Sequence, residues 1–247
     1  MKLTILGTAG AYPGPGESCS GYLLESGDSR ILLDCGTGVL ANLQKHISIR
    51  DLTHIVISHI HADHFLDLIP LRYALMLGFK GHRITLHLPP GGAATLQSVV
   101  SFLNDPAFFS SMFDIEEYRP GVMTVSGLKI EVAPVPHYVP SFALAVTGDR
   151  KFAFSADCGP NDTLVKLASG SDLLLTEAAI LKPEDDPGPR GHLTMVEAAQ
   201  VASRAGASRL LFSHIYSERD YSSQLAAARK AFAGPVEVAE VNRSYVF

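Results

Sequence analysis

The sequence predicts a mixed α/β (α+β) fold made of two β-sheets with helices on their outer faces. Short apolar strands alternate with turn signals and amphipathic helices along the whole chain. Hydrophobic residues make up 47% of the 247 positions, which is enough for a substantial core. No linker divides the chain, and its one weakly hydrophobic stretch, Pro183–Gly191, has only the length of a loop. We therefore expect a single domain over residues 1–247 that contains two mixed sheets.

The first third of the chain is predicted to form four strands, because it holds four short apolar runs bounded by turn residues. These runs are Lys2–Leu6, Gly21–Glu25, Arg30–Leu33 and His54–Ile57. A helix from about Gly38 to Lys45 precedes the fourth strand, and another helix should follow the histidine-rich segment that begins at His59.

The middle of the chain favours β-structure, and the last third returns to alternating helices and strands. The middle should contain a strand at Ile84–Leu88, a helix around Ala93–Leu103 and a β-rich stretch from Phe113 to Phe154. We expect hairpin turns at Gly121, Gly127 and Gly148-Asp149. The last third predicts helices near Asp162–Ala168, Thr194–Ala205 and Tyr221–Phe232, strands at Leu173–Thr176 and Arg209–Phe212, and one or two closing strands.

Composition bears on which partners and which location to expect. The net charge is −5 and the lysines and arginines are scattered, which argues against a large polyanionic partner. Three cysteines form no disulfide framework, and the N-terminus indicates a strand and no signal peptide, so a cytoplasmic location is expected. No apolar run approaches the ~18 residues of a membrane span. The most apolar segment, Leu66–Phe79, could form core or the surface of a homodimer.

Residues 59–64, His-Ile-His-Ala-Asp-His, hold four metal-type side chains directly after an apolar run. Histidines at a spacing of two cannot share one face of a helix, so this segment belongs on a loop that leaves a strand. There His59 and His61 can hold one cation, while Asp63 and His64 turn toward a second. The simpler alternative is a polar loop in which Asp63 caps a helix, but that alternative leaves the clustering of histidines unexplained.

Further candidate ligands follow predicted strands elsewhere in the chain. His137, Asp157 and His214 each stand at the end of an apolar run, and His192 precedes the helix expected at Thr194. Each of them alone has an ordinary structural explanation. Together with the 59–64 segment they are typical of a two-metal site, in which the Asp157 carboxylate could bridge both cations.

In this order the motifs resemble the metallo-β-lactamase fold superfamily. The matching pieces are the opening strand with Gly7–Gly10, then Leu33–Gly36, Ser58–His64, His137, Ser155–Gly159 and Ser213–Ile215. The resemblance implies a four-layer αββα sandwich with a dinuclear site between the sheets. It implies that one metal is held by His59, His61 and His137, that the other is held by Asp63, His64 and His214, and that Asp157 bridges them. Zinc suits these two divalent sites best, with manganese or iron as alternatives.

Within that superfamily the chain resembles the ribonuclease Z and phosphodiesterase branch through Thr176–Ala179 and Gly191–Thr194. The resemblance implies that His192 protonates the leaving oxygen and that Glu177 orients it, while plain capping of a helix or loop is an equal alternative for Glu177. Ribonucleases Z that bind tRNA carry a long Gly/Pro-rich arm between the positions matching His137 and Asp157. Only nineteen residues separate these positions here. A tRNA partner is therefore disfavoured, although it stays open.

The chain also resembles small bacterial proteins that include atypical cyclic-AMP phosphodiesterases. The stretches that carry this likeness are Ser20–Leu24, Asp34–Leu40, Ser141–Leu144 and Gly234–Val236. It implies a hydrolase acting on a small phosphodiester, such as a 3′,5′-cyclic nucleotide. The residues fit this chemistry, because two cations would lower the pKa of a shared water and so supply a hydroxide that Asp63 could steer. The alternatives are tRNA 3′ processing, lactone or thioester hydrolysis, and a scaffold without metal. The loop Gly14–Ser20 could cover the substrate or form a simple surface turn.

Overall fold

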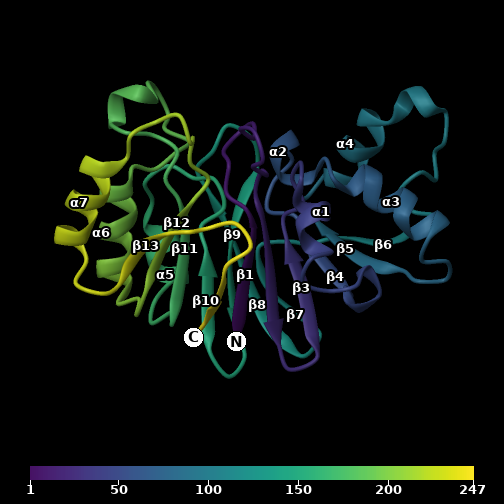
Figure 1. Ribbon diagram of the computed structural model, residues 1–247, viewed down its shortest axis with the longest axis horizontal. Helices are drawn as coiled ribbons and strands as arrows, with labels where there is room; N and C mark the ends of the chain where they lie inside the picture. Colours follow the sequence, from purple (N-terminus) through teal and green to yellow (C-terminus); the bar gives the residue numbers. More distant parts are fainter.

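The computed structural model describes residues 1–247 and contains two seven-stranded sheets (Figure 1). The first sheet has the order β14-β1-β2-β3-β4-β5-β6. Its strands are β1 (Lys2–Gly7), β2 (Gly21–Ser26), β3 (Ser29–Leu33), β4 (His54–Val56), β5 (Ile84–Leu88), β6 (Phe113–Glu117) and β14 (Ser244–Val246). The second sheet has the order β13-β12-β11-β10-β9-β8-β7. Its strands are β7 (Gly121–Val125), β8 (Leu128–Val135), β9 (Ser141–Thr147), β10 (Lys151–Phe154), β11 (Leu173–Glu177), β12 (Leu210–Ser213) and β13 (Val236–Val238).

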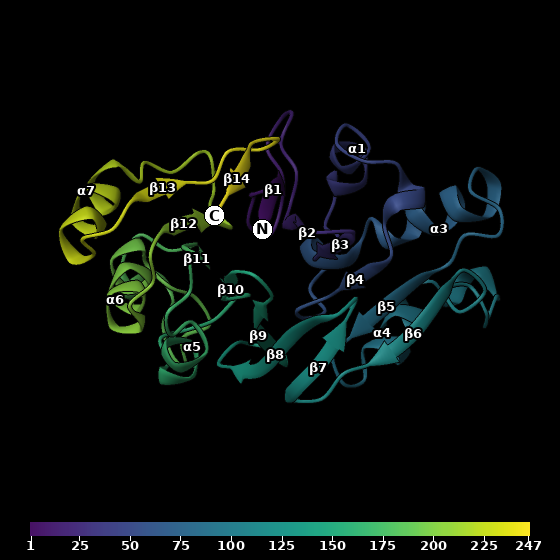
Figure 2. The same cartoon turned by 90° about the horizontal axis from the view of Figure 1, so that it is seen from below.

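Helices cover the outer faces of both sheets, as Figure 2 shows from below. The first sheet packs against α1 (Val39–Leu43), α3 (Leu68–Leu77) and α4 (Gly92–Val99), and the second against α5 (Asp162–Leu167), α6 (Met195–Ala205) and α7 (Ser222–Ala231). The one-turn helix α2 (Ala62–Phe65) lies at the top of the molecule in Figure 1. Single 3₁₀ turns span Ile49–Asp51, Ser101–Leu103 and Pro183–Asp185. This is the predicted αββα sandwich of two mixed sheets.

Three buried apolar layers hold the sandwich together. The middle layer joins Leu24 and Ile31 of the first sheet to Leu144 and Phe152 of the second. Strand β8 shows why the sheets can pack this way, because over residues 128–133 its buried residues alternate with more exposed ones, the period of two expected for a half-buried strand. Each fully buried Leu or Phe side chain contributes roughly 1.5–3 kcal/mol relative to an exposed one.

The sequence of α6, the helix that precedes β12, contains capping residues at both ends. Thr194 is the N-cap of α6, since its hydroxyl accepts from the Glu197 amide (3.2 Å) and the Glu197 carboxylate accepts from the Thr194 amide (3.0 Å). The helix ends at Gly206, whose φ of 64° lies in the left-handed region that glycine adopts without cost. The predicted helix boundaries at Thr194 and Ala205 are thus explained by local chemistry.

One predicted turn is wrong. Gly121 is not a hairpin turn but the first residue of β7, with a φ of 132°. The chain crosses there from β6 in the first sheet to β7 in the second, and glycine permits this backbone conformation. The turns at Gly127 and Gly148-Asp149 do connect neighbouring antiparallel strands. The helix expected at Ala93–Leu103 ends at Val99 and continues as a 3₁₀ turn.

The topology brings several strand ends to one edge of the molecule. Strands β3, β4 and β5 are mutually parallel, as are β10, β11 and β12. Carboxyl ends of parallel strands meet at a common edge, where open α/β sheets bind their ligands. The longest helix, α6, has eleven residues, and none of the helices could span a bilayer. That residues 1–247 fold as one domain stays a prediction.

Candidate metal centre

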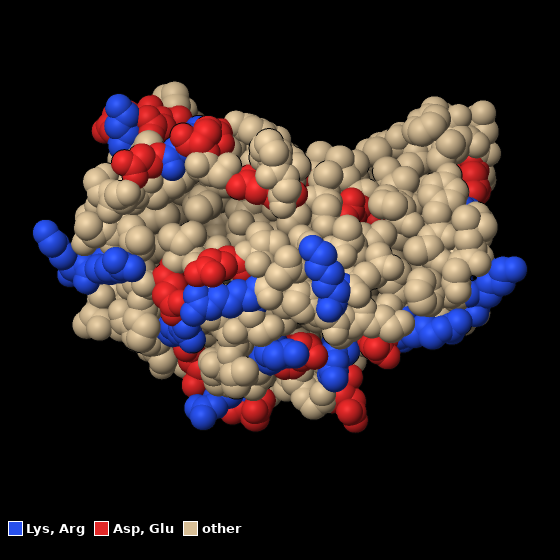
Figure 3. Space-filling model, viewed as in Figure 1, with Lys and Arg blue, Asp and Glu red and all other residues tan.

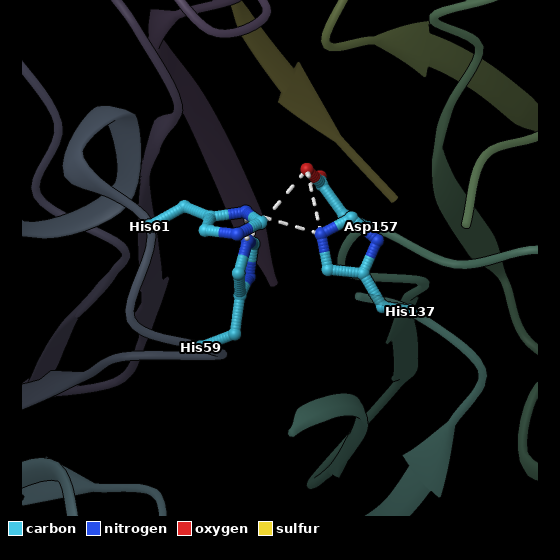
Figure 4. A group of neighbouring side chains, drawn as sticks. All are labelled: His59, His61, His137 and Asp157. Carbon is cyan, nitrogen blue, oxygen red and sulfur yellow. Dashed lines mark hydrogen bonds and ion pairs between the residues drawn. The ribbon is translucent and has the colours of Figure 1, made fainter. Parts of the chain in front are cut away.

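The first group of potential ligands lies where β4, β8 and β10 end (Figure 4). Figure 4 shows His59 and His61 entering from one side and His137 and Asp157 from the other. His61 Nδ1 lies 3.2 Å from His59 Nε2 and 3.1 Å from His137 Nε2. Asp157 Oδ2 lies 3.7 Å from His59 Nε2 and 3.9 Å from His137 Nε2. Three imidazole nitrogens and a carboxylate oxygen therefore converge on one point.

The second group shares Asp157 with the first and adds Asp63, His64 and His214. His64 Nε2 lies 3.4 Å from Asp63 Oδ2 and 3.4 Å from Asp157 Oδ2. His214 Nε2 lies 3.1 Å from Asp157 Oδ2. All four side chains are buried, so they do not form a surface cluster of acidic groups. Asp157 stands between the two groups, as a bridging carboxylate would.

The two groups fit cations on geometric grounds. Tetrahedral ligands at about 2.0–2.1 Å from a zinc ion lie roughly 3.3–3.4 Å apart, close to the 3.1–3.2 Å between these imidazole nitrogens. His64 Nε2 is buried and makes no well-aligned hydrogen bond, although the Asp63 and Asp157 carboxylates each lie 3.4 Å away. Such an orphaned polar atom costs about 1–3 kcal/mol. A cation held by His64, Asp63 and Asp157 would remove that cost, so the residues fit a binuclear site.

Contacts behind His64, His137 and His214 fix which nitrogen of each of these imidazoles faces the centre. Asp34 Oδ2 lies 2.8 Å from His64 Nδ1, which leaves Nε2 for a metal. The backbone carbonyl of Gly191 accepts from His137 Nδ1 at 2.8 Å, and Ser20 Oγ lies 3.0 Å from His214 Nδ1. Metal-binding histidines in proteins usually hold their second nitrogen in this way.

Backbone strain concentrates around the centre. Seven residues other than glycine have a positive φ, and four of them, Ala11, Asp34, Ala156 and His214, are site residues or their neighbours. The Ala11 amide donates to Asp63 Oδ2 (2.8 Å), and Ala156 precedes Asp157. Such conformations cost about 1–3 kcal/mol each and persist where the surroundings over-determine them, often at functional sites.

Burial and neighbouring charges set the protonation states of the candidate ligands. Burial lowers the pKa of His59 well below its usual value, and it also lowers the pKa values of His61 and His137. These imidazoles are therefore neutral and present lone pairs, which is the form that binds metal. Burial alone would raise the pKa of Asp157, but His214, His64 and His59 hold it well below its usual value. Asp157 is thus a carboxylate.

His192 and Glu177 form a second functional unit beside the two groups. His192 Nδ1 lies 3.0 Å from Glu177 Oε1, and the buried Glu177 carboxylate also accepts from the amides of Cys158 (2.9 Å) and Ala179 (3.0 Å). The His192 ring centroid is 5.1 Å from that of His137. Burial acts to lower the pKa of His192, but the Glu177 carboxylate outweighs it and raises the pKa to about 9.

The structure brings all the predicted site residues together, including those from distant segments. The loop Gly14–Ser20 divides in two, because Ser18, Cys19 and Ser20 are buried while Pro15 and Gly16 are exposed. A covering role for its exposed half stays a prediction. Sequence reasoning gave no role to Asp34 and missed Asp186, which accepts from the amides of Gly191 and His192. Asp34 ends a buried strand, a signal that could have been used, whereas Asp186 lies in a polar loop without any signal.

An αββα sandwich with two adjoining histidine–aspartate groups at the edge of its sheets defines a class of metal-dependent hydrolases. Residues 29–215 match the family described as the β-lactamase superfamily domain, and the chain belongs to that family. Family and ligand set together make it a metal-dependent hydrolase of the metallo-β-lactamase fold.

Several relatives match over nearly their whole length. The probable metallo-hydrolase YhfI of Bacillus subtilis is 28% identical over 97% of both chains, and its crystal structure superposes with a TM-score of 0.89, covering 99% of each chain at 26% identity. Rv1339 of Mycobacterium tuberculosis is 32% identical over 99% of this chain and 92% of its own. The ribonuclease Z of Halorubrum lacusprofundi is 28% identical over 95% of this chain and 93% of its own.

Proposed function

We propose that the protein is a phosphodiesterase that hydrolyses a small phosphodiester, such as a 3′,5′-cyclic nucleotide, with two zinc ions at the ligand groups. The observation that carries this proposal is the His192–Glu177 pair beside those groups. Bound cations would acidify a water molecule and offset charge on the phosphoryl oxygens. In this proposal one ion is held by His59, His61 and His137, and the other by Asp63, His64 and His214.

The remaining step of the reaction needs a proton donor, which the chain supplies. Cleavage of a phosphodiester expels an alkoxide that must be protonated, and a raised pKa keeps His192 charged near neutral pH. Glu177 binds Nδ1 of His192, so Nε2 is the nitrogen that can donate to the leaving oxygen. Asp63 adds a carboxylate oxygen that can orient the attacking water. Hydrolysis of a lactone or thioester has less need of this acid.

The short chain between His137 and Asp157 supports a small substrate. This segment consists of β9, a tight turn at Gly148–Arg150 and β10, with no arm that could dock a large partner. The alignment with the ribonuclease Z covers 291 positions, more than the 247 residues of this chain, so that enzyme carries inserted residues. The alignment with YhfI covers 246 positions.

Surface charge supports the same choice of substrate. On the face shown in Figure 3, Lys and Arg side chains lie mainly along the lower half of the molecule and do not surround the notch at the top. A protein that grips tRNA would need cations that follow the phosphate backbone. A single phosphodiester needs only the metal centre.

The proposal is tested by offering zinc-loaded protein a panel of 3′,5′-cyclic nucleotides, a tRNA precursor with a 3′ trailer, and a lactone and a thioester. His64→Ala serves as the control, because it removes a ligand from the second group. Hydrolysis of cyclic nucleotides that is lost in His64→Ala supports the proposal. Cleavage of the tRNA precursor alone would favour the ribonuclease Z alternative. The 28% identity to a ribonuclease Z is the observation that favours this alternative. Turnover of only the lactone or thioester would refute phosphodiester chemistry.

A further inference from the structure

A small pocket adjoins the first ligand group on the side of the loop between β5 and α4. Its volume is about 220 Å³, and its walls include Ile60, Pro89, Pro90, Thr95, Val139 and Pro140. Ile60 stands between the ligands His59 and His61, and Val139 follows the ligand His137 by two residues. Because consecutive Cα atoms are about 3.8 Å apart, the Cα atoms of Ile60 and Val139 lie within roughly 8 Å of the Cα atom of a ligand histidine.

The walls of this pocket suit a flat, uncharged group. They consist mainly of proline rings, glycine backbone and two aliphatic side chains, and the Thr95 hydroxyl already donates to the Gly91 carbonyl (3.1 Å). Ile60 packs closely against α4, since a Cβ atom at Gly92 would lie 3.4 Å from Ile60 Cδ1. Pockets that enclose a whole drug-sized ligand measure about 300–1,000 Å³, so this pocket can take one ring system only.

The pocket is not built for a phosphate. Helix N-termini commonly attract anions, but at the start of α4 the Glu117 carboxylate already accepts from the amides of Gly91 (3.1 Å) and Ala93 (3.0 Å). A second anion placed there would meet the negative charge of Glu117. The phosphate therefore belongs at the metal centre, and the neutral part of a substrate belongs in the pocket.

A larger hollow elsewhere does not compete for this role. It measures about 930 Å³ and is lined by charged and polar residues, among them Glu25, Arg30 and Thr53. Arg30 stands near the start of β3 and Thr53 precedes β4, whereas the ligands follow the carboxyl ends of strands. This hollow is therefore at the opposite ends of those strands from the metal centre.

We propose that the pocket beside Ile60 holds the nucleobase, or an equivalent planar ring, of the phosphodiester substrate. The inference rests on the proposed phosphodiesterase function and adds to it a basis for choosing among substrates. Burial of an apolar ring there anchors the substrate at one end while its phosphate meets the ligand groups. A phosphodiester without such a ring would be held by the metal centre only, and so would bind more weakly.

The test fills the pocket from the exposed side of α4. Thr95→Phe places an aromatic ring in the pocket, and Thr95→Val removes the hydroxyl without filling the space. Ala94→Phe is the matched control, because Ala94 is the exposed neighbour of Thr95 on the same helix and does not line this pocket. Thermal unfolding of each variant shows that it is folded. The measured quantity is the ratio of the affinities of zinc-loaded protein for 5′-AMP and for ribose 5-phosphate, which differ by the base.

We expect the unchanged protein and Ala94→Phe to bind 5′-AMP about tenfold or more tightly than ribose 5-phosphate. In Thr95→Phe this ratio should fall to near one, and the KM for the cyclic nucleotide should rise by a similar factor. If the protein hydrolyses cyclic nucleotides but the ratio is near one from the start, or is the same in Thr95→Phe, the pocket assignment is overturned and the function stands. A protein that hydrolyses no phosphodiester overturns the function together with the pocket's role.

Discussion

At the residue scale, the proposed proton donor can be separated from the metal ligands by the choice of leaving group. His192→Ala should lower kcat on a cyclic nucleotide by about 10²–10⁴-fold, the usual contribution of a general acid. A p-nitrophenyl phosphodiester releases a stable phenolate that needs no proton, so its hydrolysis should fall far less. Metal content should stay unchanged, which elemental analysis checks. Equal losses on both substrates would show that His192 acts in some other way.

Asp34 offers a second test at this scale. Its carboxylate lies against His64 Nδ1 and also accepts from the amide (2.7 Å) and hydroxyl (2.9 Å) of Ser58. Asp34→Asn keeps the shape but removes the charge, so we expect zinc affinity to fall by about 10–100-fold in chelator competition. Asp67→Asn is the matched control, because Asp67 accepts from the Leu40 amide instead (2.8 Å). An equal loss of affinity in both variants would argue against the orienting role.

At the element scale, the loop that carries His192 is held by one carboxylate. Asp186 accepts from the hydroxyl of Tyr138 and from the amides of Gly191 (2.8 Å) and His192 (3.1 Å). Burial alone would raise the pKa of Asp186, but these three donors bring it below its usual value. A lowered pKa in the folded state means that the stabilisation is fully present above the unfolded pKa of about 3.9 and is lost as the pH falls through the folded pKa.

Asp186→Asn should therefore lower the free energy of unfolding by about 1–2 kcal/mol at pH 7. The difference from the unchanged protein should shrink below about pH 4, because there the unfolded chain begins to protonate Asp186 while the folded protein still holds it as a carboxylate. Urea unfolding of the metal-free proteins at pH 7, 5 and 3.5 measures both values. A difference that is constant over this range would mean that the charge of Asp186 does not hold the loop.

The elements also show what the sequence can predict. The sequence predicts His137, Asp157 and His214 as ligands because each follows an apolar run, and strand ends of one sheet share an edge. The pocket beside Ile60 could not be found, because it forms only when the β5–α4 loop packs against a loop from another strand. The prediction of a hairpin turn at Gly121 is wrong for a related reason. A glycine before a strand occurs both in hairpin turns and where the chain crosses from one sheet to the other, so the sequence does not distinguish the two.

At the scale of the whole molecule, the candidate metal centre connects the two sheets. His59 and His61 follow β4 of the first sheet, whereas His137 and His214 follow β8 and β12 of the second. Cations bound there would act as cross-links across the sandwich. A ligand that binds only the folded state stabilises it by about 2.7 kcal/mol at a concentration 100 times its Kd.

Removal of metal should therefore lower the Tm by several degrees, because for a chain of this size each 1 kcal/mol corresponds to about 2–4 °C. Differential scanning calorimetry with and without a chelator measures the shift, and added zinc should restore it. The loss should be smaller in His64→Ala, which lacks a ligand for one of the two cations and also relieves the orphaned Nε2 of His64. If the chelator leaves the Tm unchanged in the zinc-loaded protein, the buried histidines do not hold metal between the sheets, and their convergence would have to be explained by hydrogen bonding alone.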